Sequence, residues 1–138
     1  MRAVQDTKTA IILLGSLALW QRLNVTAFIS TGIASAAPEA MGEIYKDQQD
    51  VTYTRLYEEP IVVLLGHSDV LARAHRLAGE RGLIRAAFID AFFSQPHGDA
   101  GRIAFASAPI GPENLVGIGL RGPKKDVDKA IKGAKLHP

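Results

Sequence analysis

The chain has 138 residues and a mass of 14.8 kDa, the size of one domain with a single hydrophobic core. Apolar residues make up 47% of it and charged residues 22%, which excludes a disordered or collagen-like chain. The absence of cysteine excludes disulfide scaffolds, thiolate zinc sites and iron–sulfur clusters, and is consistent with a reducing compartment. The net charge of +2 is too small to indicate a nucleic-acid partner. We therefore expect one domain over residues 1–138.

The N-terminal region allows two interpretations. Arg2 and Lys8 precede an apolar run from Thr9 to Trp20, an arrangement that a secretory signal would also show. Asp6 in the would-be basic region, and the polar residues that follow the run, favour a cytoplasmic protein instead. The run is also shorter than the roughly 20 apolar residues of a membrane-spanning helix, so we expect no membrane segment.

The first half of the chain predicts two strands and a helix. The apolar runs Thr9–Leu14 and Ile61–Leu65 are typical of strands covered on both faces. Between them, apolar residues recur at helical spacing from Val25 to Ala36, and Pro38 is expected to end that helix. The polar stretch that follows contains Ile44–Tyr53, which we interpret as a small surface hairpin.

The second half continues the alternation of helices and strands. Ser68 or Asp69 caps a predicted helix with its apolar face over Val70–Ala78, and Gly82 ends it. A last helix is expected between Pro123 and Gly133. Further strands are predicted over Ile84–Ile89, Ile103–Ala106 and Leu115–Ile118. The sequence therefore predicts a three-layer α/β/α domain with a mixed sheet of four or five strands, in which Ile103–Ala106 is the fifth.

A glycine motif lies near the C-terminus. The segment from Gly117 to Gly122 matches the GxGxxG pattern of dinucleotide-binding proteins. That site also needs another strand and an acidic residue about 20 positions further on, and only 16 residues follow Gly122. We interpret the segment as a tight turn from strand to helix, and expect no cofactor.

The window from Asp90 to Asp99 carries the chemistry best suited to a site. It follows a predicted strand, at the position where α/β sheets commonly bind ligands. Asp90 is suited to orient or deprotonate a nucleophile, Ser94 to attack or hold a water, and His97 to act as a general base. Aspartate and serine are also ordinary turn residues, so a purely structural loop is the alternative. The spacing matches neither a GxSxG elbow nor a histidine pair that would bind a metal.

The C-terminal segment is basic. Residues 121–138 contain six lysines and arginines and two aspartates, a net charge of +4. Lys124 and Lys125, near the start of a predicted helix, are candidates to hold a phosphate or a carboxylate. A solvated helix face is the alternative, and the segment lacks the interleaved aromatic residues of an RNA-binding surface.

Several segments resemble a known bacterial family. They are residues 20–28, the loop that ends in His97 and Arg102, and residues 121–125 and 132–136. Together they resemble the family catalogued as domain of unknown function 2000, over nearly the whole chain. That family is similar in fold to the type II peptidyl-tRNA hydrolases, which cleave the ester between a peptide and its tRNA. The resemblance implies the same fold and a homodimer.

The resemblance also implies positions for a site. Asp90 and Ala91 match an Asp-Ala pair of those enzymes, Ser94 and Gln95 stand at their Thr-Gln, and Asn24 stands at a helix glutamine. Two positions depart from the enzymes' pattern. Trp20 replaces a lysine and Phe92 replaces a glycine. Because a tRNA-cleaving site needs that cation, we expect little or no peptidyl-tRNA hydrolysis, and tRNA is not the favoured partner.

We expect a pocket between the start of the first helix and the loop after the third strand. Its predicted residues are Asn24, Asp90, Ser94 and His97, and the further candidates for ligand binding are Gln95, Arg102, Lys124 and Lys125. The function that follows is that of an α/β protein which binds a small polar or anionic ligand without a metal. The alternatives are a divergent hydrolase of the peptidyl-tRNA type, and a dimeric interaction protein that binds no ligand.

Overall fold

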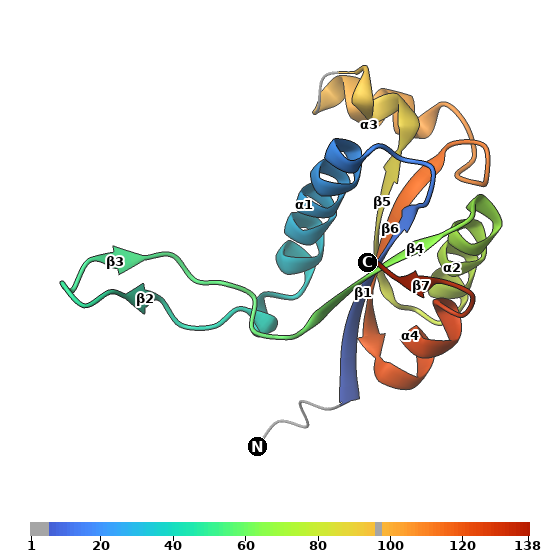
Figure 1. Ribbon diagram of the computed structural model, residues 1–138. Coiled ribbons are helices and arrows are strands. Elements are labelled where there is room, and N and C mark those ends of the chain that lie inside the picture. The colour runs from blue at the N-terminus through green and yellow to red at the C-terminus, as the bar shows by residue number, and fades with distance from the viewer. Residues whose placement is uncertain (1–5, 96–97) are drawn as a thin grey trace.

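The computed structural model describes residues 6–95 and 98–138 and centres on a five-stranded mixed sheet (Figure 1). The strand order is β5-β6-β1-β4-β7. β1 pairs parallel with β4 and antiparallel with β6, and β6 pairs antiparallel with β5. Strands β1, β4 and β5 therefore point the same way, and their last residues lie at one end of the sheet, here called the carboxyl edge. The strands of this sheet are β1 (Thr7–Leu14), β4 (Ile61–Gly66), β5 (Ile84–Ile89), β6 (Leu115–Pro123) and β7 (Lys135–Leu136).

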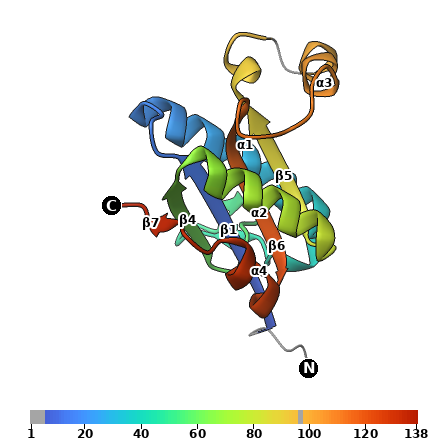
Figure 2. The same ribbon diagram turned by 90° about the vertical axis from the view of Figure 1, so that its right-hand side faces the viewer.

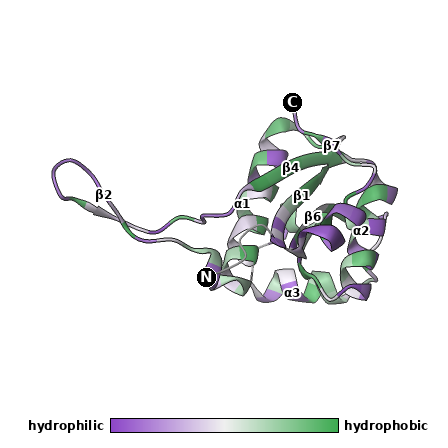
Figure 3. Cartoon of the chain, turned by 90° about the horizontal axis from the view of Figure 1, so that it is seen from below, coloured by the Kyte–Doolittle hydropathy of each residue, from purple (hydrophilic) through white to green (hydrophobic). Residues whose placement is uncertain are grey.

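Helices cover both faces of the sheet, as Figures 1 and 2 show. Helix α1 (Leu19–Ala36) covers one face, and α2 (Ser68–Glu80) and α4 (Lys124–Ala130) cover the other. Alternate residues of β1 serve the two layers: Ile11 packs in the core under α1, and Ile12 in the core under α2. Figure 3, coloured by hydropathy, shows the green of hydrophobic residues along β4. None of the described helices is long and apolar enough to cross a membrane.

The glycine motif lies inside β6, so its interpretation as a strand-to-helix turn was wrong. A Cβ on Gly117 would lie 2.4 Å from Val25 Cγ1, and one on Gly119 would lie 2.3 Å from Ile29 Cγ2. Both contacted side chains belong to α1. The glycines are needed because they let the helix pack directly against the backbone of the strand.

One element type and one helix start also differ from the sequence predictions. Residues 103–106 are not a strand but the end of helix α3 (Asp99–Ala106), and β7 is the fifth strand instead. Ile103 is 71% exposed, so its apolar character does not reflect burial in a sheet. Helix α1 begins at Leu19, six positions before Val25, because the side chain of Gln21 accepts a hydrogen bond from the Ala18 N–H and closes the first turn.

The predicted hairpin is present, and it extends away from the sheet on the side that α1 covers (Figure 1). After the short helix η2 (Pro38–Ala40), strands β2 (Tyr45–Lys46) and β3 (Thr52–Tyr53) form a two-stranded sheet of their own. We call residues 42–58 the arm. Every residue from 43 to 56 is exposed.

The turn of the arm depends on one carboxylate. Asp47 Oδ1 accepts hydrogen bonds from the backbone N–H of Val51 and of Gln49, at 3.0 and 2.8 Å. The Val51 bond, supported by the Gln49 bond, holds the pKa of Asp47 below its usual value. Because the pKa is lowered in the folded turn, the ionised carboxylate stabilises the turn above the unfolded pKa. This stabilisation is lost as the pH falls through the lowered value.

We therefore expect the backbone amide resonance of Val51 to move toward its unfolded position as the pH falls from about 5 to about 2. In the variant Asp47→Ala the same resonance should lack this acidic step. NMR titration of both proteins provides the measurement. A wild-type Val51 resonance that is unchanged over this range would show that Asp47 does not hold the turn.

Candidate functional site

A cavity at the carboxyl edge lies where β1 and β4 end side by side. The Gly15 N–H donates a hydrogen bond to the Gly66 carbonyl at 3.0 Å, which joins the turns after the two strands. Strand β7 closes the other side, because Lys135 pairs with Leu65 and Leu136 with Leu64. These elements enclose a cavity of about 720 Å³, here called the edge cavity. It is lined by Leu14, Gly15, Ser16, Leu65, Gly66, His67, Ser68, Gly133, Lys135, Leu136 and Pro138.

Four polar side chains of the edge cavity can donate hydrogen bonds. Ser16, His67, Ser68 and Lys135 contribute side chains, and none of its lining residues is an aspartate or a glutamate. Helix α2 begins at Ser68, and the preceding His67 makes no side-chain capping hydrogen bond. The first N–H groups of this 13-residue helix are therefore not capped by the residue before it. Asp69 lies in the first turn of the helix but does not line the cavity. A lining with donor side chains and without carboxylate side chains, beside the positive end of a helix dipole, favours an anion.

An arginine supports the β1 side of the cavity. The Arg22 guanidinium donates to the carbonyl of Gly15 at 2.8 Å and to that of Leu17 at 3.1 Å, which fixes the turn between β1 and α1. Its Nη1 lies 3.4 Å from Nε2 of His137. Arg22 lines a second hollow of about 440 Å³, which shares Leu136 and Pro138 with the edge cavity. A fixed cation thus lies next to the cavity as well as Lys135 inside it.

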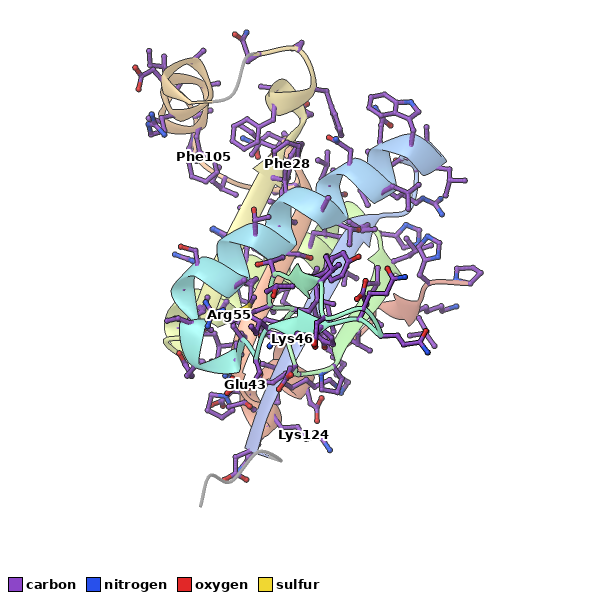
Figure 4. The ribbon with its side chains drawn as sticks, turned by 90° about the vertical axis from the view of Figure 1, so that its left-hand side faces the viewer. Phe28, Glu43, Lys46, Arg55, Phe105 and Lys124 are labelled. Carbon is purple, nitrogen blue, oxygen red and sulfur yellow. The ribbon has the colours of Figure 1, made fainter. Side chains whose placement is uncertain are left out.

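The structure brings together the two segments predicted to form the pocket, but aromatic rings make the contact. Helix η3 (Asp90–Phe93) follows β5, and Phe93 packs edge-on against Trp20 of α1 with ring centroids 5.7 Å apart. The rings of Phe28 of α1 and Phe88 of β5 are also in contact, tilted by 42° with their centroids 6.1 Å apart. Figure 4 shows Phe28 on the side of α1 that faces this end of the sheet. The ring of Trp20, at the position where the resemblance implies a lysine in the enzymes, is therefore part of a hydrophobic cluster.

The polar residues predicted for that pocket surround this cluster. Asn24 is half-buried on α1, and Asp90 and Ser94 are exposed. The Ser94 hydroxyl donates a hydrogen bond to the Ala91 carbonyl at 3.3 Å. Such a bond within a turn is what the alternative interpretation, a purely structural loop, expects of this serine. Among the described residues, no hydrogen bond joins Asn24 to Asp90 or Ser94. His97 lies outside the described residues.

The remaining predicted ligand residues are dispersed. Gln95 is exposed, and Arg102 forms an ion pair with Asp99 at 2.7 Å on the surface of α3. Lys124 and Lys125 begin α4 at the opposite end of the sheet, next to the start of β1 (Figure 4). The structure therefore does not bring the two lysines together with Asp90.

The edge cavity itself was not predicted. Ser16, His67 and Lys135 were not among the residues predicted to bind a ligand. A signal was present in the sequence, because each of the two apolar runs ends in a glycine followed by a polar residue, Gly15-Ser16 and Gly66-His67. That the runs form adjacent parallel strands is a tertiary fact, and only the fold places the two turns together.

These features define a small α/β protein with an open mixed sheet. The chain belongs to the family described as Protein of unknown function (DUF2000), whose model matches residues 7–138, and the predicted resemblance to that family is confirmed. It is similar to a solved structure of a protein of unknown function from Agrobacterium tumefaciens strain C58. The two are 40% identical, the match covers 96% of this chain and 98% of that one, and the TM-score is 0.90. No curated protein matches the chain.

Proposed function

We propose that the protein binds a small anionic ligand, with a carboxylate or phosphate group, in the edge cavity. The observation that carries the proposal is a cavity of about 720 Å³ whose lining has four side chains that can donate hydrogen bonds and no aspartate or glutamate. The cavity lies outside the carboxyl ends of two parallel strands, where open α/β sheets commonly bind ligands.

Each part of the cavity has a role in this proposal. The N–H groups at the start of α2 and the hydroxyls of Ser16 and Ser68 donate hydrogen bonds to the anionic group, and Lys135 supplies the charge. The side chains of Leu14, Leu65 and Leu136 form the apolar part of the lining. A ligand with one anionic end and an apolar body fits this division.

Binding of inorganic phosphate tests the proposal by titration calorimetry. We expect weak binding, with a Kd on the order of 1 mM for so small a probe. The variant Lys135→Gln should weaken it about fivefold, the effect of losing roughly 1 kcal/mol from an exposed charge. Lys129→Gln is the matched control, because Lys129 is an exposed lysine of α4 outside the cavity lining. Equal affinities for the two variants would remove the edge cavity as the phosphate site.

We keep the type II peptidyl-tRNA hydrolase-like fold, and a divergent hydrolase activity, as the alternative proposal. In that alternative Asp90, Ser94 and His97 carry the chemistry and Asn24 binds the substrate. The packing of Trp20 against Phe93 weighs against it, because a hydrophobic contact stands where the enzymes have a cation. A cytoplasmic location is likewise a proposal, supported by a chain without cysteine.

A further inference from the structure

The solvent side of α1 lacks the charges that a water-facing helix normally carries. The helix has a single charged residue, Arg22, and its guanidinium is hydrogen-bonded to the turn before the helix. Leu19, Trp20 and Leu23 are 64%, 61% and 65% exposed in the first turns. A helix that is apolar on its outer face as well as its inner face is normally covered by protein.

The arm is the second unpartnered apolar surface of the chain. Its two strands have only two residues each, and an isolated two-stranded hairpin is marginally stable in water. A hairpin of this length reaches roughly 20 Å from its base, at about 3.3 Å per residue. Apart from Tyr57 at its base, the large apolar side chains of the arm are exposed by about half or more: Ile44, Tyr45, Val51, Tyr53 and Leu56.

The base of the arm, by contrast, is fixed in the body of the protein. The buried Arg121 of β6 binds both oxygens of Glu59 at 3.0 and 2.9 Å, just after the arm, and Glu39 at 3.3 Å, just before it. The Tyr57 hydroxyl lies 2.6 Å from the hydroxyl of the buried Thr9. The sequence therefore specifies the direction in which the arm leaves the sheet, a constraint that a solvated loop would not need.

We propose that a second copy of this chain covers both surfaces: in a two-fold symmetric dimer, the arm of each protomer packs across the exposed face of α1 of the other. The arm leaves its own body on the side that α1 covers, so protomers whose α1 faces are turned toward each other also present their arms to each other (Figure 1). One chain thus supplies both halves of an isologous interface.

The size and charge of the two surfaces fit this partner. Eight large apolar side chains take part in each protomer, and if each loses on the order of 80 Å² of exposed area, the pair loses roughly 1,300 Å². This is within the range of specific interfaces. Residues 43–58 contain four carboxylates and two cations, a net charge of −2, whereas the only charge of α1 is positive. The arm and the helix therefore do not repel each other.

Light scattering coupled to gel filtration gives the first test. The wild type should have twice the mass of the 14.8 kDa chain at micromolar concentration. Leu23→Glu on α1 and Leu56→Glu on the arm should each give monomers, and circular dichroism establishes that each variant is folded. Ile103→Glu is the matched control, because Ile103 is an exposed apolar residue of α3, and it should remain dimeric. A monomeric wild type, or dissociation by Ile103→Glu to the same extent, overturns the proposal.

Cross-linking tests the exchange of arms without depending on a destabilising variant. Since the chain has no cysteine, only engineered thiols react with a bifunctional maleimide. Leu23→Cys and Leu56→Cys, carried on chains of different tagged length, should yield a mixed cross-linked species after exchange of subunits. The pair Ile103→Cys and Leu56→Cys should not. A wild-type dimer that gives no Leu23–Leu56 cross-link contradicts the arm exchange.

Discussion

Replacing Arg121 with methionine is expected to lower the free energy of unfolding by about 3–5 kcal/mol, because it removes the positive charge that is paired with the buried carboxylate of Glu59. The side chains of Arg121 and Glu59 are 8% and 9% exposed, and two parallel hydrogen bonds join them. The hydrogen bond to Glu59 holds the pKa of Arg121 above its usual value, which favours the charged form of the pair. A fall in Tm on the order of 15 °C should accompany the loss.

The double variant Arg121→Met/Glu59→Met provides the control for this prediction. It removes both charges and leaves apolar side chains of similar volume, so it should recover most of the lost stability. Denaturant unfolding of the wild type, both single variants and the double variant completes a double-mutant cycle, which gives the interaction energy of Arg121 with Glu59. A loss below about 1 kcal/mol for Arg121→Met would show that the pair does not anchor the base of the arm.

Replacing Gly119 with alanine is expected to cost about 2–3 kcal/mol, because a methyl group has no room between β6 and α1. The new Cβ would lie 2.3 Å from Ile29 Cγ2, which is attached to the branch point of that side chain and cannot swing away freely. Either the helix moves off the sheet or the strand shifts. Thermal unfolding should show a fall in Tm of roughly 8 °C.

Gly15→Ala is the matched control for Gly119→Ala. Its nearest neighbour, the Gly66 carbonyl oxygen, lies 3.8 Å from the position of the added Cβ, an ordinary contact. This variant should change the stability by less than about 0.5 kcal/mol. Equal losses at the two positions would show that close packing of α1 on β6 is not what requires glycine.

The central fold was predictable because burial on both faces leaves a clear pattern. β1, β4 and β5 are short apolar runs, and α2 has one apolar face, so their types and approximate limits follow from the sequence. The glycines of β6 were misinterpreted because glycine is a turn residue in most contexts, and only the approach of Val25 and Ile29 explains it here. The apolar residues 103–106 were assigned to a strand, whereas Ile103 is exposed on α3.

The candidate site was less predictable, for a physical reason. The sequence shows which polar residues follow each strand, but which strands lie side by side is decided by long-range pairing. Asp90 follows β5, the outermost strand on one side of the sheet. Ser16 and His67 follow β1 and β4, which are hydrogen-bonded neighbours. Lys135 joins them through the pairing of β7 with β4. No local pattern near residue 135 indicates that pairing.

The measurement that tests the edge cavity most directly is NMR mapping of phosphate binding on the ¹⁵N-labelled protein. If the anion binds there, the backbone resonances of Ser16, His67, Ser68 and Lys135 should shift together with one saturation curve, and those of Asp90, Ser94 and Gln95 should not move. Saturable shifts confined to Asp90, Ser94 and Gln95, or no saturable shift at all, would contradict the account.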